Sequence, residues 1–254
     1  MSSSTEPQSG AGRDHYSYSH YGSREVAEGF DALRFGGPIG RHLLDTQRAL
    51  LEDALAPARG PTIIDVGTGT GRAAIGLAQA GAVVTGVDAS AEMLRVARSR
   101  AADARAVVRF GLADAHALPF ASESVDAAVC LRVLMHAVDW RRCLGELCRI
   151  ARWRVVVDFP ALASMAAIES GGRYLAKSVG RNVQAYRVIS EREVARAFGR
   201  HGFRVVMVRR QFVLPIALHR AVGRVAFTRS VEGALATVGL LRVLGSPVTL
   251  VAER

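Results

Sequence analysis

Between Pro61 and Phe159 the sequence alternates short runs of β-branched residues with longer stretches of helical periodicity. This alternation is typical of parallel strands joined by right-handed helical crossovers, because a tight turn cannot connect two parallel neighbours. Five strands are expected here, at residues 62–66, 82–87, 106–110, 124–130 and 154–158. Two later runs, 204–209 and 248–252, complete a predicted α/β sheet of seven strands.

The stretches between the strands carry apolar residues at helical spacing. A helix is expected from Arg72 to Gln79, and another from Trp140 to Ala151. Ser90 is placed to cap a helix that follows the second strand. Ser190 and Glu193 have the spacing of a reciprocal capping box, in which each side chain accepts a hydrogen bond from the other residue's amide.

The length and composition indicate one large domain, which we expect to find in the cytoplasm. With 254 residues, half of them hydrophobic, the chain can bury one sizeable core. Residues 1–23 are polar and aperiodic, and we expect them to form a disordered tail. The chain start lacks the basic and apolar regions of a secretory signal, and no uncharged apolar stretch reaches the roughly 18 residues of a membrane span.

Two further features bear on binding partners. Cys130, Cys143 and Cys148 lack the spacing of zinc or redox sites, so we expect reduced thiols and no metal site. The net charge of +10 comes almost entirely from arginines scattered along the chain, and no nucleic-acid-binding motif accompanies them. A nucleic-acid partner is therefore not expected.

A glycine-rich turn joins the first expected strand to the first helix. The run from Asp65 to Gly71 reads D-V-G-T-G-T-G, and its glycines let the backbone approach a ligand without a Cβ clash. Asp88 ends the second strand and Asp114 follows the third, so both lie at the carboxyl edge where such sheets bind ligands. Asp88 could accept hydrogen bonds from both hydroxyls of a ribose. The structural alternative for the glycine-rich run is a plain tight turn, and for Asp88 it is a helix cap.

These residues resemble the cofactor motifs of the class I S-adenosylmethionine-dependent methyltransferases, particularly the group that includes the ubiquinone and menaquinone biosynthesis methyltransferases. The resemblance covers roughly residues 30–159 and includes the D-x-G-x-G-x-G loop, Asp88, and Asp114 before the run 118–120. It implies a Rossmann-like, mostly parallel sheet with helices on both faces and an antiparallel last strand. A nicotinamide-dependent oxidoreductase is the rival interpretation, but its turn normally reads G-x-G-x-x-G.

The resemblance also implies roles for single residues. Asp65 would orient the loop and meet the amino-acid end of S-adenosylmethionine through water. Asp88 would hold the ribose, and Asp114 would accept a hydrogen bond from the adenine amine. The implied cofactor-binding residues are Asp65, Gly67, Gly69, Gly71, Asp88, Ala113 and Asp114.

His136 lies in the turn after the fourth expected strand, which in the resembled family usually reaches the reacting methyl group. A histidine can remove a proton from an acidic hydroxyl or carbon acid at neutral pH, so His136 is the candidate catalytic base. The alternative is a histidine that packs under the loop. The turn lacks the N/D-P-P-Y/F/W signature of amino-group methyltransferases, which favours an oxygen or carbon atom as the methyl acceptor. Methyl transfer to such an atom requires no metal.

The remaining segments are expected to bind the acceptor. A single domain over residues 24–254 would comprise cap helices at 24–60, the cofactor-binding core at 61–159, and acceptor-binding additions at 160–189 and 211–246. We thus expect a methyltransferase acting on a small acceptor; a cofactor-binding protein that has lost its acceptor site is the alternative.

The second addition has the pattern of one amphipathic basic helix. Its apolar face would carry Leu218, Val222, Val225 and Ala226. Beside that face recur Arg220 and Arg224, which are the candidate acceptor-binding residues. An amphiphilic, anionic, lipid-like or prenylated acceptor would suit such a helix, as would peripheral contact with the inner membrane face. A helix packed on the core, with its arginines in water, is the alternative.

Overall fold

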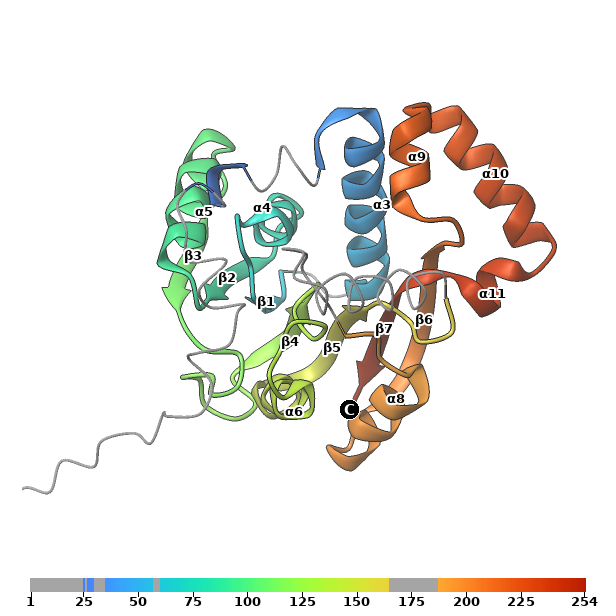
Figure 1. The fold of residues 1–254 in the computed structure, drawn as a ribbon. Coiled ribbons are helices and arrows are strands. Elements are labelled where there is room, and N and C mark those ends of the chain that lie inside the picture. The colour runs from blue at the N-terminus through green and yellow to red at the C-terminus, as the bar shows by residue number, and fades with distance from the viewer. Residues whose placement is uncertain (1–24, 26, 30–34, 57–59, 165–186) are drawn as a thin grey trace, which may run out of the picture.

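A computed structural model describes residues 25, 27–29, 35–56, 60–164 and 187–254. Within these residues, helices cover both faces of a seven-stranded sheet in the order β3-β2-β1-β4-β5-β7-β6 (Figure 1). The expected tail, residues 1–23, lies outside the described residues, and so does most of the addition expected at 160–189.

All seven expected strands are present, and the predicted fold class is confirmed. The strands are β1 (Thr62–Val66), β2 (Val83–Asp88), β3 (Val108–Leu112), β4 (Val125–Cys130), β5 (Ala151–Phe159), β6 (Arg204–Phe212) and β7 (Ser246–Glu253). Strands β1 to β5 pair in parallel, whereas β7 runs antiparallel to both β5 and β6. The carboxyl ends of β1 to β4 therefore meet at one edge of the sheet.

The described helices include those expected between the strands. They are α3 (Gly37–Leu55), α4 (Arg72–Gln79), α5 (Ala91–Asp103), α6 (Trp140–Ile150), α8 (Glu191–Arg200), α9 (Ile216–Val222), α10 (Val225–Thr237) and α11 (Leu240–Leu244). The Ser90 cap is confirmed, because its Oγ accepts a hydrogen bond of 3.1 Å from the amide of Met93. This bond fixes the start of α5 next to the end of β2.

The expected capping box at the start of α8 is wrong. In the described part of the chain the Ser190 side chain makes no capping hydrogen bond. The Glu193 carboxylate instead pairs with the Arg141 guanidinium of α6 at 3.0 Å, and the Ser190 carbonyl accepts from the Glu193 amide. The Glu193 side chain is thus turned toward α6 rather than back toward the Ser190 amide.

The sheet separates two hydrophobic cores. Successive side chains of a strand point to opposite faces, so Ile63 packs with α3 and α4 on one side. Its neighbour Ile64 packs with α6 and α8 on the other. Both isoleucines are about 1% exposed. Cores on both faces hold the strands rigidly, which fixes the edge from which the loops emerge.

Between β6 and β7 the expectation of one amphipathic helix is wrong. Gly223 adopts a left-handed conformation with φ +68° and ends α9, so the apolar pattern continues on the separate helix α10. Leu218 and Val222 therefore lie on one helix, while Val225 and Ala226 lie on the next. Nowhere in the described part of the chain does a helix have both the length and the apolar character needed to cross a membrane.

A buried hydrogen-bond network around Glu232 organises this helical insertion. Glu232 of α10 accepts hydrogen bonds from the amides of Val213 and Leu214, at 2.8 and 3.0 Å, where the chain leaves β6. The same carboxylate lies 2.9 Å from the imidazole of His219 on α9, and Thr228 contacts the other imidazole nitrogen at 3.1 Å. Glu232 thus connects both helices to the end of the sheet, and its carboxylate is engaged by groups inside the protein.

Candidate functional site

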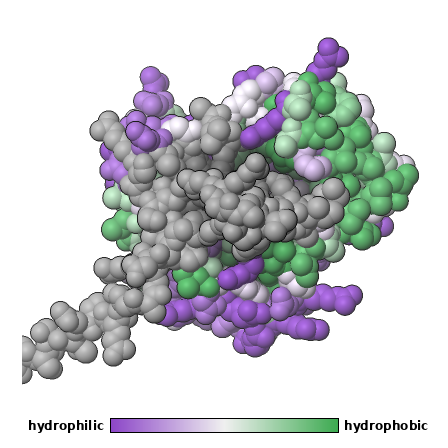
Figure 2. Space-filling model, viewed as in Figure 1, coloured by the Kyte–Doolittle hydropathy of each residue, from purple (hydrophilic) through white to green (hydrophobic). Residues whose placement is uncertain are grey.

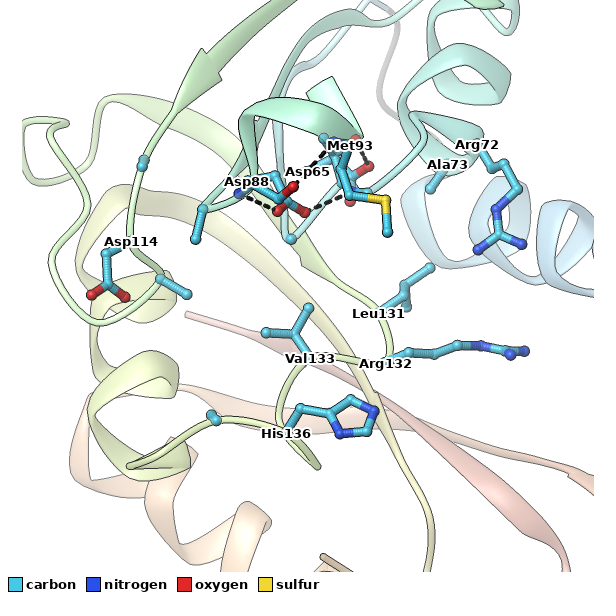
Figure 3. A pocket seen from close by; sticks show the side chains of 18 of the residues that line it. Asp65, Arg72, Ala73, Asp88, Met93, Asp114, Leu131, Arg132, Val133 and His136 are labelled. Carbon is cyan, nitrogen blue, oxygen red and sulfur yellow. Dashed lines mark hydrogen bonds between the residues drawn. The ribbon is translucent and has the colours of Figure 1, made fainter. Parts of the chain in front are cut away.

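A pocket lies at the carboxyl edge of the sheet, where the turns after β1, β2, β3 and β4 converge (Figure 3). It brings together most of the residues singled out in the sequence. These are Asp65, Gly67, Gly69, Asp88, Ala113, Asp114 and His136. The fold therefore brings Asp65 and His136 to one cavity, although they are 71 positions apart in the sequence.

The glycine-rich turn is held against the end of β2. The amides of Gly67 and Thr68 both donate to the Val87 carbonyl, at 2.8 and 2.9 Å. Gly67 has φ +70°, and a Cβ added there would lie 2.1 Å from a methyl group of Val133 in the turn after β4. Only glycine fits, because any side chain would combine an unfavourable backbone conformation with a steric clash.

Asp65 is buried at the base of this turn. Its carboxylate accepts a hydrogen bond of 2.7 Å from the Thr68 hydroxyl. Burial raises the pKa of Asp65 to about 6, although the Thr68 hydrogen bond acts in the opposite direction. The carboxylate is thus tied to the loop that borders the pocket, and its ionised form destabilises the unliganded fold.

Asp88 has both carboxylate oxygens engaged by backbone amides. Oδ2 accepts from Gly69 at 2.8 Å and Oδ1 from Ser90 at 2.9 Å. Burial raises the pKa of Asp88, while these amide donors lower it. The Ala89 amide is a further donor to this carboxylate. Since a carboxylate can accept about four hydrogen bonds, some acceptor capacity remains for a ligand in the pocket that Asp88 lines.

The turn after β3 contributes Ala113 and Asp114. The Asp114 carboxylate lies 2.8 Å from Nδ1 of His116 and also accepts from the His116 amide at 2.9 Å. On the other side of the ring, Nε2 of His116 accepts from the Asp139 amide at 3.2 Å. His116 therefore fixes the orientation of Asp114 at the pocket wall.

His136 lies across the pocket from Asp65 and Asp88 (Figure 3). Its amide donates to the Val133 carbonyl at 2.8 Å, which fixes the turn that carries it. The residue is 8% exposed and lines the pocket beside Val133 and Ala137. The imidazole is therefore positioned to meet a ligand that occupies the cavity.

Three of the residues selected from the sequence lie elsewhere. In the described part of the chain Gly71 is outside the pocket lining; it has φ +81°, and an added Cβ would lie 3.0 Å from Cβ of Ala97 on α5. Gly71 thus packs against α5. Arg220 and Arg224 are exposed on the insertion and are likewise outside the pocket lining. The helix break at Gly223 lies between them, so Arg220 belongs to α9 and Arg224 directly precedes α10.

Two arginines of the pocket wall were missed. Arg72 is the first residue of α4, and its Cζ lies 3.4 Å from the ring centroid of Phe35. Arg132 follows β4 in a left-handed conformation with φ +61°, and its Cζ lies 5.1 Å from the same centroid. The Arg132 amide donates to the buried Asp158 carboxylate. The position of Arg72 directly after the glycines could have identified it from the sequence. The contact with Phe35 joins segments that are distant in the sequence, so no sequence pattern predicted it.

Within the described ranges, no group of three or more His, Cys, Asp or Glu residues could hold a metal ion. Cys130, Cys143 and Cys148 are separate, buried thiols. Burial raises the pKa of Cys148 to about 12 and raises those of Cys130 and Cys143 as well. A thiol is a weak nucleophile until it ionises, so these cysteines suit the interior rather than chemistry.

Comparison with known sequences relates the chain to methyltransferases. Residues 64–154 match the family model described as a methyltransferase domain. A demethylmenaquinone methyltransferase of Clavibacter sepedonicus is 33% identical over 178 residues, which cover 66% of this chain and 71% of that protein. An O-methyltransferase of Penicillium expansum is 39% identical over 129 residues, covering 45% of this chain and 47% of the relative. The chain thus matches less than half the length of the second relative.

Solved structures show the same fold at low identity. Magnesium protoporphyrin IX methyltransferase from Synechocystis PCC 6803, solved with bound SAH, has a TM-score of 0.65 and 19% identity. The match covers 94% of this chain and 98% of that one. Geranyl diphosphate C-methyltransferase from Streptomyces coelicolor A3(2) has a TM-score of 0.64 and 21% identity, covering 84% and 80%. These similarities concern the arrangement of the elements.

We expect Asp65→Asn to stabilise the unliganded protein at about pH 8 and to change little at about pH 4. The folded-state pKa of about 6 lies above the ordinary 3.8, so the wild-type protein should lose stability as pH rises through 6. The difference at about pH 8 is at most about 3 kcal/mol. Urea unfolding at both pH values measures it, with the exposed Asp103→Asn as control. A variant that is less stable than the wild type at the higher pH would contradict this account.

Proposed function

Since the chain belongs to the class I S-adenosylmethionine-dependent methyltransferases, we propose that it transfers a methyl group to an oxygen or carbon atom of a small, apolar acceptor. The observation that carries this proposal is the convergence of Asp65, Asp88, Asp114 and His136 on one pocket. S-adenosylmethionine is the methyl donor of this family, and the nicotinamide interpretation is therefore set aside.

The carboxylates of the pocket are suited to the donor. When bound, S-adenosylmethionine supplies a methyl group on a positively charged sulfur. Asp88 would accept hydrogen bonding from the ribose hydroxyls, because its carboxylate is fixed by backbone amides and retains some acceptor capacity. Asp114, oriented by His116, would accept from the adenine amine. Asp65 would act through the loop that it holds, by way of Thr68.

His136 would remove the proton of the acceptor. An imidazole nitrogen can accept a proton near neutral pH, and the residue lies in the turn after β4 that faces the carboxylates. The larger part of the rate would come from holding donor and acceptor in a reactive geometry, for which the rigid sheet edge provides a support.

The pocket favours an apolar acceptor. Apolar side chains line part of it, among them Met93, Leu131, Val133 and Ala137. Relatives named for demethylmenaquinone and for geranyl diphosphate support the same view, because both of these molecules carry isoprenoid chains. A prenylated or otherwise lipid-like acceptor is therefore the class that we propose.

The helical insertion would place the enzyme at an anionic membrane surface, where such an acceptor is found. Figure 2 shows hydrophobic residues gathered on the side of the molecule that carries α10 and α11. The exposed apolar side chains there are Leu218, Val222, Phe227, Val238, Leu240 and Val243. Arg220, Arg224, Arg229 and Arg242 are exposed on the same insertion. Glu232 is the only acidic residue in the sequence from 213 to 245, and it is buried against His219.

Replacing Asp88 with alanine tests the donor site. We expect affinity for S-adenosylmethionine to fall by about 1.5 to 3 kcal/mol, the range for hydrogen bonds to a charged group. Isothermal titration calorimetry measures the loss, and Asp126→Ala on the opposite edge of the same sheet is a matched control. Unchanged affinity in Asp88→Ala would remove the ribose assignment.

The His136→Ala variant tests the base. Turnover should slow about a hundredfold or more, in line with the usual contribution of a general base, while donor affinity should hardly change. A labelled-methyl assay with prenylated quinol acceptors gives the rate, and His201→Ala, an exposed position at the end of α8 outside the pocket lining, is the control. Turnover within a few-fold of the wild type would make His136 a structural residue.

Co-sedimentation with lipid vesicles tests the membrane-facing insertion. We expect binding to anionic vesicles that weakens as salt rises, because each arginine near such a surface contributes about 1 kcal/mol and salt screens it. Arg220→Glu with Arg224→Glu should reduce binding about tenfold or more. Arg192→Glu with Arg196→Glu, an exposed pair of equal spacing on α8, should not. Equal recovery of all three proteins with the vesicles would contradict the proposal.

A further inference from the structure

The pocket has a cationic end that the proposed roles of its carboxylates leave unexplained. Arg72 begins α4 directly after the glycine-rich turn, and Arg132 lies in the turn after β4. Both line the pocket. In Figure 3 both guanidinium groups lie on the side of the view opposite Asp114, with Asp88 in between. The two ends of the cavity therefore carry opposite charge.

One aromatic ring gathers the two guanidinium groups. Phe35 is 6% exposed and precedes α3, and its ring centroid lies within 5.1 Å of Cζ of both Arg72 and Arg132. The negative face of an aromatic ring attracts cations. The buried carboxylates of Asp65 and Asp158 interact electrostatically with Arg72 and Arg132, respectively. Phe35 thus helps to position both guanidinium groups at one end of the pocket.

The backbone of Arg132 is also held in place. A positive φ is unfavourable for arginine, and here the amide donates to the carboxylate of Asp158, a buried residue of β5. Such backbone conformations persist where surrounding contacts enforce them, and they cluster at functional sites. The contact makes Asp158 a positioning residue that directs the Arg132 side chain toward the pocket wall.

We propose that Arg72 and Arg132 form an anion subsite, which binds a carboxylate or phosphate-type group of a ligand in the pocket. Guanidinium groups match such ligands because their planar donors can bond two oxygens at once. Two molecules could supply the anion: the methyl donor, through its amino-acid carboxylate, and the acceptor, through an acidic head group. The inference rests on the proposed function, so its test must separate the two.

The test compares Arg72→Gln and Arg132→Gln with the wild type by isothermal titration calorimetry. Arg109→Gln, an exposed position on β3 outside the pocket lining, is the matched control. Three probes are used: S-adenosylhomocysteine, 5′-methylthioadenosine, which lacks the amino-acid group, and inorganic pyrophosphate. Pyrophosphate is titrated into the protein alone and into its complex with S-adenosylhomocysteine. Circular dichroism confirms that each variant is folded, and either arginine variant alone is sufficient for the comparison.

The pattern of losses identifies the source of the anion. If the subsite holds the donor carboxylate, affinity for S-adenosylhomocysteine should fall about tenfold or more, while affinity for 5′-methylthioadenosine stays constant. If it holds an acceptor group, the variants should keep S-adenosylhomocysteine but lose the binding of pyrophosphate to the complex. The subsite is wrong if both variants match Arg109→Gln with all three probes. If the wild-type protein binds neither S-adenosylhomocysteine nor 5′-methylthioadenosine, the assignment of the pocket to the methyl donor is refuted. Pyrophosphate binding would still test the anion subsite in that case.

Discussion

The turn between β1 and α4 is held to the end of β2 by three consecutive amides. Those of Gly67 and Thr68 share the Val87 carbonyl, and that of Gly69 reaches the Asp88 carboxylate. These bonds fix the path of the loop and the direction of the carboxylate together. The orientation of Asp88, the start of α4 and the position of Arg72 all depend on this contact between neighbouring strands.

Much of the fold could be predicted because its determinants are local. The β-branched runs gave every strand, and the Ser90 cap was visible in a few residues. Errors arose where local patterns compete with other contacts. The start of β3 was placed too early, for example, because the amide of Ala106 still bonds to Ala101 at the end of α5. Gly223 likewise divides an apolar pattern that a single helix would satisfy.

The site was predictable to the extent that its residues adjoin strand ends. Asp88 and Asp114 follow directly from strand positions, since parallel strands bring their carboxyl ends to one edge. Arg132 and Phe35 could not be selected in this way, because their meeting is a contact between residues far apart in the sequence. Arg220 and Arg224 were selected for charge and spacing alone, and the fold places them on the surface.

The close approach of Val133 to Gly67 couples the glycine-rich turn to the turn after β4. The Val133 side chain fills the space that a Cβ of Gly67 would occupy, and the Val133 carbonyl holds the amide of His136. A displacement of the donor loop must therefore be matched by the turn that carries the imidazole. Such coupling is reciprocal in free energy. Whatever ligand orders one wall of the cavity also favours the ordered form of the other, so donor and acceptor would each strengthen the binding of the other.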